Sequence, residues 1–381
     1  MADPGRQPRP FHLLIYSDAG ELGGAEMVLG RLLAALPPEI RTTLVAVDPD
    51  VLAWLGERRP GAATVHVPGV RDRTDLAGMR RHRRLFRELR PDLVQFNLSS
   101  ASSCQWAILA AATIPRLRLV ALENSPMGTW SGLSSALKRL TARRLAAHVA
   151  VGDRAARLIE ESSGLPGGSI RVIHHGLDPD SIGRAEVARP EAPTVLTVSR
   201  HDPVKGLDVL IDAMALTAPH VHAVVVGSGP EGPALRDRVD RLGLGARVEL
   251  CEPEPGSMDA ASTMWAFDAL VLPSRLEGFP VTVLEAMFAG LPVIATDVGS
   301  VREQVQPGVT GWIVPPEDPS ALAAAIDELV EDPDAARAMG EAGRSVAHER
   351  FTMQATVEAW LRLYDEVLGP ERVSDGPSTP R

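Results

Sequence analysis

Residues 267–287 read FDALVLPSRLEGFPVTVLEAM, and this stretch carries the strongest structural signal in the 381-residue chain. Its first part, 267–274, is mostly apolar and is interrupted by proline near its end, which is typical of a buried parallel strand. From Phe279 the pattern becomes helical, and the first backbone N–H groups of a helix attract anions. Two carboxylates, Glu277 and Glu285, flank this turn and can accept hydrogen bonds from paired hydroxyl groups. The segment therefore predicts a nucleotide-sugar pocket, with amides for the diphosphate and carboxylates for the sugar hydroxyls.

Two cations follow another predicted strand, at residues 194–198. Arg200 and Lys205 stand in the loop after this strand, and Gly206 follows them. Two fixed positive charges at a strand end can neutralise a departing nucleoside diphosphate without a metal ion. The same pair could equally belong to a solvated loop in which Lys205 opens a helix. Glu277 and Glu285 further along the chain favour the functional interpretation.

Short apolar segments alternate with amphipathic segments along most of the chain. The first series of predicted strands covers residues 11–16, 43–47, 64–67, 93–96, 117–122, 147–151 and 170–173. The second series covers residues 194–198, 223–226, 248–250, 269–272, 293–295 and 311–314. Helical patterns separate the strands, for example at residues 25–36, 75–89, 103–113 and 133–146. This alternation indicates an α/β fold of two parallel sheets with helices on both faces.

The composition fits two globular domains. Hydrophobic residues make up 45% and charged residues 23% of the chain, so each half can bury its own core. The formal net charge of -10 argues against nucleic acid as a partner. Two distant cysteines, Cys104 and Cys251, argue against a disulfide framework. Residues 1–10 lack the apolar core of a signal peptide, and no stretch approaches the roughly 20 apolar residues of a membrane helix. We expect a cytoplasmic protein.

The segments 274–280 and 285–297 together resemble the signature of the family-4 retaining glycosyltransferases, which have the GT-B fold. The family's E-x7-E motif falls on Glu277 and Glu285, and its R-x4-K-G element is similar to residues 200–206. The resemblance implies two Rossmann-like domains that face each other across a cleft. It also implies that the nucleotide binds mainly to the second domain, that the acceptor binds to the first, and that the final helix crosses back to the first domain.

The predicted domain boundaries follow from this comparison and from the alternation of strands and helices. Residues 11–183 form the acceptor-side domain and residues 194–350 the nucleotide-sugar-binding domain. Residues 184–193 break the alternation and form the linker, and residues 351–369 form the returning helix. The termini, residues 1–10 and 370–381, are rich in Pro, Arg, Ser and Gly and are expected to be disordered.

The resemblance also implies a role for each residue of the site. Arg200 and Lys205 would grip the donor diphosphate, Glu277 would hold the donor sugar and Glu285 the ribose. Catalysis would rest on Arg200, Lys205 and Glu277. Further donor contacts would come from the turn and helix start at Gly278, Phe279, Pro280, Val281 and Thr282. The resemblance implies no cofactor and no catalytic metal.

Paired glycines, Gly23 and Gly24, follow the first predicted strand and precede the first helix. Glycines there let a backbone approach an anion at a helix N-terminus. The family has a similar loop that reaches toward the donor phosphate. Gly23 and Gly24 could equally form a flexible turn.

The acceptor side departs from the family pattern. Many members have a histidine after the strand that corresponds to residues 117–122, whereas this chain has Glu123 and Asn124 there. Asparagine can hydrogen-bond to a hydroxyl group but cannot act as a base. We therefore place Glu123 and Asn124 on the acceptor side and leave the identity of the acceptor open.

The resulting prediction is a hexosyltransferase that moves a sugar, with retention of configuration, from a UDP- or GDP-linked donor to a hydroxyl acceptor. The acceptor could be a polysaccharide, a lipid or a secondary-metabolite scaffold of a bacterium. Two alternatives stay open: a sugar-nucleotide epimerase, and a non-catalytic nucleotide-sugar-binding partner of another transferase. The base, the sugar and the oligomeric state are not predicted.

Three other motifs have structural interpretations. The G-x-G-x-x-G match at residues 227–232 lies in the middle of a domain and predicts a tight turn before a helix rather than an NAD site. The two D-x-D matches, at residues 48–50 and 178–180, contain proline and predict turns rather than a metal site.

Two basic stretches remain. Residues 137–145 form a basic amphipathic segment, which leaves open contact with the inner face of a membrane or a packed stripe with a solvated face. Residues 80–84 are interpreted as a solvated helix face.

Overall fold

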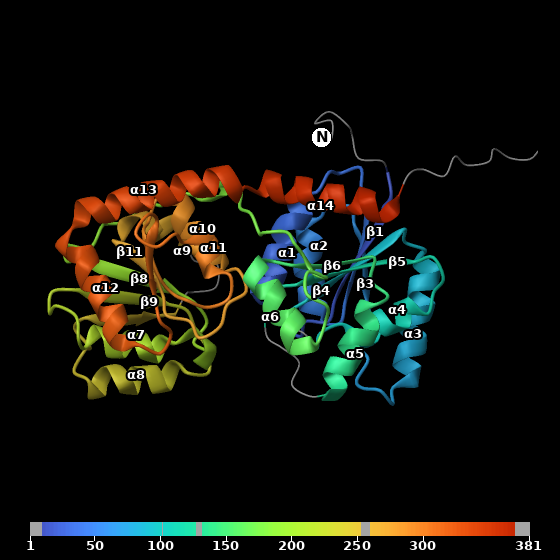
Figure 1. Cartoon of the computed structure of the whole chain (residues 1–381), viewed down its shortest axis with the longest axis horizontal. Helices are drawn as coiled ribbons and strands as arrows, with labels where there is room; N and C mark the ends of the chain where they lie inside the picture. Colours follow the sequence, from blue (N-terminus) through green and yellow to red (C-terminus); the bar gives the residue numbers. More distant parts are fainter. Residues whose placement is uncertain (1–9, 101, 127–131, 253–259, 370–381) are drawn as a thin grey trace, which may run out of the picture. The chain divides into compact units, whose positions relative to one another are not determined.

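The computed structural model describes residues 10–100, 102–126, 132–252 and 260–369. These residues fall into two compact units (Figure 1). Unit 1 lies within Met1–Leu122, Trp130–Val149 and Val357–Arg381, and unit 2 within Glu123–Thr129 and Ala150–Thr356. None of the helices in the described ranges combines the length and the apolar composition needed to span a bilayer.

The first sheet has seven strands in the order β3-β2-β1-β4-β5-β6-β7. β1 pairs in parallel with both β2 and β4, so the chain leaves β1 on one side and returns on the other. The strands are β1 (His12–Ser17), β2 (Arg41–Ala46), β3 (Ala63–His66), β4 (Leu93–Leu98), β5 (Arg118–Glu123), β6 (Ala147–Ala150) and β7 (Arg171–Val172). The helices between them are α1 (Gly24–Ala35), α2 (Pro49–Arg58), α3 (Leu76–Leu89), α4 (Gln105–Ala112), α5 (Gly132–Ala142) and α6 (Asp153–Ser163).

The second sheet has six parallel strands in the order β10-β9-β8-β11-β12-β13. They are β8 (Thr194–Val198), β9 (His222–Val226), β10 (Val248–Cys251), β11 (Ala269–Leu272), β12 (Val293–Thr296) and β13 (Gly311–Val314). The helices of this half are α7 (Leu207–Met214), α8 (Gly232–Arg241), α9 (Ala260–Thr263), α10 (Val281–Phe288), α11 (Val301–Gln304), α12 (Pro319–Glu331) and α13 (Pro333–Arg350).

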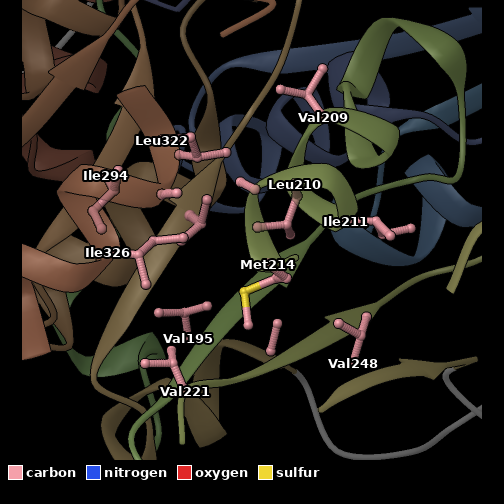
Figure 2. Close-up of a cluster of buried hydrophobic side chains, with 14 of the residues drawn as sticks. Val195, Val209, Leu210, Ile211, Met214, Val221, Val248, Ile294, Leu322 and Ile326 are labelled. Atoms are coloured by element: carbon pink, nitrogen blue, oxygen red, sulfur yellow. The ribbon is translucent and has the colours of Figure 1, made fainter. Parts of the chain in front are cut away.

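A buried apolar cluster holds the second sheet against α7 and α12 (Figure 2). Ile211 and Met214 of α7 and Ile326 of α12 are fully buried, as is Ile294 of β12. Each such side chain contributes about 1.5–3 kcal/mol by leaving water. The cluster therefore gives the strand ends of this sheet a rigid support.

All thirteen predicted strands are present, within two residues of the expected bounds. Most could be found because a strand buried on both faces, such as β1, β4 or β11, is a continuous apolar run, whereas β3 and β7 are short and largely exposed. The two D-x-D matches have a structural role, as expected. They form helix starts, however, and not the simple turns that were predicted. Asp48 accepts hydrogen bonds from the backbone N–H groups of Asp50 and Val51 and so caps α2, which the sequence did not predict. Asp178 caps a short 3-10 helix in the same way.

The predicted linker segment packs against unit 2. Ala185 donates its backbone N–H to Ser262 and accepts a hydrogen bond from the Trp265 indole at 3.0 Å. The Arg184 guanidinium lies over the same indole ring, 4.1 Å from its centre. The segment is thus a fixed part of unit 2 from residue 184 onward.

The last described helix, α14 (Met353–Leu368), runs from unit 2 into unit 1, as the family resemblance implies. Tyr364 is fully buried and donates its hydroxyl hydrogen to Gln95 of β4 at 2.5 Å. Phe11, just before β1, packs edge to face on the Tyr364 ring at 5.7 Å. The helix therefore completes the core beside the first sheet.

Candidate functional site

The predicted donor residues lie at the switch point of the second sheet. β8 lies between β9 and β11, so the chain that leaves β8 turns away from the chain that leaves β11. Ligands of open α/β sheets bind where two neighbouring connections diverge in this way. The loop after β8 carries Arg200 and Lys205, and the loop after β11 carries Glu277. Two sequence elements about 70 residues apart therefore meet at one strand edge.

An ion pair joins these two loops. The Lys205 ammonium donates a hydrogen bond to Glu277 Oε1 at 2.7 Å. Ser274 Oγ donates to the same oxygen at 2.7 Å. Glu277 is buried, and the Lys205 side chain is 26% exposed. Because an ammonium has three N–H donors, Lys205 can hold Glu277 and still donate to a ligand.

Gly206 fixes the backbone next to this pair. Its φ of +64° lies in the left-handed region, and an added Cβ would stand 2.1 Å from the carbonyl oxygen of Pro273. No other residue fits there without displacing the end of β11. Asp202 caps the short 3-10 helix that ends at Lys205, by accepting from the Val204 N–H at 3.1 Å. The loop is therefore held rigidly where it presents the lysine.

The use of lysine at this position is itself informative. Lys205 is one of two lysines among the 39 Lys and Arg residues of the chain. Arginine therefore supplies almost every other positive charge, and lysine differs from it in carrying a compact point charge. This scarcity was a signal in the sequence that our interpretation did not use.

The two arginines of the site region have different surroundings. The side chain of Arg200 is 54% exposed, and its guanidinium lies 3.2 Å from Asp202. Arg275 makes two 2.8 Å hydrogen bonds to Asp208 in the first turn of α7 and also contacts Glu317. These hydrogen bonds raise the pKa of Arg275 above its usual range. Arg275 therefore fastens α7, whereas Arg200 extends toward solvent.

The predicted helix start is present, but Pro280 contributes no backbone N–H donor to it. α10 begins at Val281 with Pro280 as its N-cap. Proline has no N–H group, so the amides at this terminus come from Val281, Thr282 and Val283 rather than from Pro280. Phe279 is buried, and its ring stacks on His174 at 4.9 Å, so its side chain supports the turn. Glu285 is buried on α10.

The loop after β12 supports the turn that carries Glu277. Gly299 has a φ of +49°, and an added Cβ would lie 1.8 Å from the carbonyl oxygen of Glu277. Ser300 donates its N–H to Gly278 O, and Gln304 Nε2 donates to Pro280 O, both at 3.0 Å. Sequence reasoning missed these three supports. A usable signal was that loops after neighbouring parallel strands lie side by side.

A half-buried carboxylate on α11, Glu303, binds the N-terminus of α6 within unit 2. Glu303 accepts hydrogen bonds from the backbone N–H groups of Asp153 at 2.9 Å and Arg154 at 3.0 Å, and lies 3.0 Å from His174 Nε2. Burial opposes its ionisation, but these hydrogen bonds outweigh burial and lower the pKa of Glu303 to about 2. Glu303 therefore stays ionised and caps α6 from a distant part of the sequence.

Glu123 and Asn124, which were predicted to lie on the acceptor side, also fall in unit 2. Glu123 ends β5 and is fully buried, and Asn124 is half-buried. A Cβ added at Gly278 would lie 2.3 Å from the backbone oxygen of Asn124, so only glycine fits there. The Asn124 backbone thus lies directly against the predicted donor turn.

The paired glycines lie at the switch point of the first sheet. Gly23 is the N-cap of α1 and Gly24 its first residue. A Cβ added at Gly24 would meet no atom within 4 Å, so space is open in front of this backbone. Two carboxylates lie behind the loop. Buried Glu26 accepts from Ser17 Oγ and Asn97 Nδ2 at 3.2 Å, and burial raises its pKa.

The second of these carboxylates, Asp18, binds the start of α4. It accepts from the Cys104 backbone N–H at 2.6 Å and from the Cys104 thiol at 3.3 Å. Burial raises the pKa of Asp18 and of the Cys104 thiol. The first switch point is thus lined by two carboxylates, Asp18 and Glu26, and the described hydrogen bonds to both come from uncharged groups.

The glycine-rich match at residues 227–232 forms the tight turn that was predicted. Added Cβ atoms at Gly227 and Gly229 would lie 1.8 Å from Ser199 O and 2.5 Å from His201 O. Both glycines therefore serve close packing against the loop after β8. α8 then begins at Gly232.

The two halves of the chain match two family models. Residues 22–181 match the model described as Glycosyltransferase Family 4, and residues 180–346 match Glycosyl transferases group 1. Each half of the chain therefore resembles a glycosyltransferase domain.

Curated relatives match part of this chain. The D-inositol 3-phosphate glycosyltransferase of Mycobacterium marinum is 32% identical over 215 residues, which cover 52% of this chain and 46% of the relative. The alpha-D-kanosaminyltransferase of Streptomyces kanamyceticus is 28% identical over 260 residues, which cover 64% of this chain and 65% of the relative. The chain spans about half the length of the first relatives it matches.

Solved structures show the fold over nearly the whole chain. HepE of Anabaena in complex with UDP-glucose has a TM-score of 0.80 at 22% identity, and covers 93% of this chain and 100% of that one. The lipopolysaccharide outer core galactosyltransferase WaaB has a TM-score of 0.72 at 18% identity, with 93% and 99% covered. The chain therefore has the GT-B fold, with two Rossmann-like domains.

Proposed function

We propose that this chain transfers a sugar from a UDP- or GDP-linked donor to a hydroxyl acceptor, with retention of anomeric configuration and without a catalytic metal. The observation that carries the proposal is the Lys205–Glu277 ion pair at the switch point of the second sheet, beside the N-terminus of α10. It brings a cation for the leaving group and a carboxylate for the sugar into one place.

The departing nucleoside diphosphate would be stabilised by fixed positive charge. Lys205 would donate its remaining N–H groups to the phosphates, and Arg200 would supply a second charge from the same loop. The amides of Val281 and Thr282 would add the positive end of the α10 dipole. Charge that is already in place costs no reorganisation when the bond breaks. This set would replace the metal ion that a diphosphate would otherwise need.

The two carboxylates would accept hydrogen bonds from the hydroxyl groups of the donor. Both described hydrogen bonds to the Glu277 carboxylate use Oε1, so Oε2 would accept from a sugar hydroxyl. Glu285 would hold the ribose diol. HepE has been solved with UDP and with UDP-glucose, which favours a UDP-linked donor here. Gly23 and Gly24 would contact the donor phosphate from the open side of their loop.

The acceptor, the stereochemistry and the location are proposed from other observations. Retention rests on the family resemblance of residues 274–297. Independence from metal is supported by the D-x-D carboxylates, because Asp48 and Asp178 are occupied as caps. Glu123 and Asn124 would line the acceptor side. Two cysteines without a disulfide suit a reducing cytoplasm.

Saturation-transfer NMR against a mixed panel of UDP-, GDP-, ADP- and dTDP-sugars tests the donor, with Lys205→Ala as the comparison. We expect one class to bind the wild type and to lose binding in the variant. Turnover should persist in EDTA, and the anomeric coupling of the product should match that of the donor. Conversion of the donor without acceptor would indicate an epimerase. Donor binding without turnover on any acceptor would support a non-catalytic partner, and no binding would contradict the site.

A further inference from the structure

Helices α3, α4 and α5 form one continuous layer of unit 1. α3 packs on α4, and α4 packs on α5 (Figure 1). The Arg83 guanidinium donates to Thr113 Oγ1 at 2.9 Å, and Arg144 just after α5 donates to Ala112 O at 2.8 Å. Outward-facing side chains of α3 and α5 therefore belong to one surface.

This layer is positively charged in a negatively charged protein. Residues 71–90 and 132–145 contain twelve Arg and Lys but three Asp and Glu, whereas the whole chain contains 39 and 49. On α3, His82 and Phe86 are buried, so Arg80 and Arg84 project from the opposite side and are exposed. On α5, Arg139 and Arg143 are exposed as well. The basic charge is thus at the surface, where Arg84 is paired with the exposed Glu88 at 2.7 Å.

Exposed leucines lie among these arginines. Leu133 is 60% exposed and Leu140 is 50% exposed, whereas Lys138 and Thr141 of the same region are buried. A packed amphipathic helix would bury the leucines and expose the lysine. α5 departs from this pattern at Leu133, Leu140 and Lys138, whereas Leu137 and Leu145 are half-buried on its packed side. Leu133 and Leu140 are two helical turns apart and share one side of the helix.

We propose that this surface binds an anionic lipid bilayer. The surface, called here the α3–α5 face, comprises Arg80, Arg84, Leu133, Arg139, Leu140 and Arg143. Leucines flanked by arginines suit the boundary between headgroups and acyl chains, where the apolar side chains are buried and the guanidinium groups meet lipid phosphates. A soluble polyanion would match the arginines but would give the leucines no apolar environment. The proposal is independent of sugar transfer.

Liposome co-sedimentation of the full chain tests it. We expect binding to vesicles of phosphatidylcholine with phosphatidylglycerol, weak binding to phosphatidylcholine alone, and loss of binding at high salt. Arg139→Glu with Arg143→Glu should weaken partitioning by at least tenfold, because each basic residue near the surface contributes about fivefold. Leu133→Ser with Leu140→Ser should weaken it comparably.

Unit 2 offers matched controls. Leu216 is 57% exposed and Leu242 is 43% exposed, so Leu216→Ser with Leu242→Ser removes leucines of similar exposure elsewhere. Arg241→Glu with Arg337→Glu makes the same change of charge on exposed arginines. Both control pairs should bind vesicles as the wild type does. Circular dichroism and UDP binding check that every variant is folded, and UDP binding separates this test from that of the proposed function.

Two results would overturn the proposal. One is wild-type protein that fails to bind the anionic vesicles, or variants of the α3–α5 face that bind as well as the controls. The other is loss of binding in the arginine pair with unchanged binding in the leucine pair. That second pattern would identify a site for a polyanion rather than a bilayer surface.

Discussion

The switch points of the two sheets have the same backbone plan and opposite chemistry. At β8 and β11 of the second sheet, Lys205 and Arg200 place positive charge close to solvent, with Glu277 paired to the lysine. At β1 and β4 of the first sheet, Asp18 and Glu26 are carboxylates that accept hydrogen bonds from neutral donors. The fold therefore provides a potential binding site at the switch point of each sheet. A few side chains then decide whether that site favours a negatively or a positively charged ligand.

Removal of the lysine should have the largest effect. Lys205→Ala is expected to reduce transfer by about 10²–10³-fold, because charge aimed at the leaving group is lost. Lys205→Arg should recover less than a tenth of the activity, since the bulkier guanidinium cannot reproduce the 2.7 Å contact with Glu277. Turnover assays on folded variants measure both. Near-normal turnover in Lys205→Ala would show that the second switch point is not the reactive one.

Glycines at the two switch points should differ in their effect on stability. Gly206→Ala is expected to lower the free energy of unfolding by about 2–3 kcal/mol, because alanine is strained at this φ and its Cβ meets Pro273. Gly24→Ala should change it by less than about 0.5 kcal/mol, since space there is open. Urea unfolding compares the two. An equal loss in both variants would contradict the assignment of Gly206 as the constrained position.

Glu303→Gln should lower the stability of the fold, because the ionised carboxylate of Glu303 stabilises it. The pKa of Glu303 is lowered to about 2, so its stabilisation is present above the ordinary value near 4.5 and is lost as the pH falls toward 2. At neutral pH the variant should be less stable by about 2 kcal/mol. Thermal melts from neutral pH down to acid should show the wild type and the variant converging. A constant difference over that range would mean that ionisation of Glu303 contributes nothing.

Glu26→Gln should have the smallest effect and the opposite pH dependence. Burial raises the pKa of Glu26, so its favourable contribution is present below the ordinary value near 4.5 and declines as the pH rises through the raised one. The wild type should therefore lose stability relative to the variant on going from pH 4 to neutral, by about 1 kcal/mol or less. The same melts used for Glu303 measure this. A gain by the wild type over that range would contradict the effect of burial.

Local sequence was sufficient to predict the strands, whereas the residues proposed for the site stay predictions. Strands such as β8 and β11 are apolar runs closed by proline, serine or charge, so their bounds depend on few residues. The E-x7-E spacing identified Glu277 and Glu285 before any contact was known. Their roles in binding and catalysis stay predictions, as do those of Arg200 and Lys205.

Contacts between distant segments could not be predicted in the same way. Lys205 and Glu277 are 72 residues apart, and neither the pairing nor the third partner Ser274 follows from local pattern. The start of α2 was interpreted as a turn because Asp-Pro-Asp suits both a turn and a capped helix. The exposure of Leu133 depends on how α5 packs, which periodicity alone does not decide.

The position of α14 has a consequence for how the chain is made. Tyr364 closes over Gln95 and Phe11, so part of the core beside the first sheet comes from the last described helix. At about 5–20 residues per second, a ribosome needs roughly 15–50 seconds to extend the chain from β4 to this helix. During that interval the nascent first sheet exposes apolar surface that α14 covers later. A chaperone bound there during synthesis would be released by the arrival of α14.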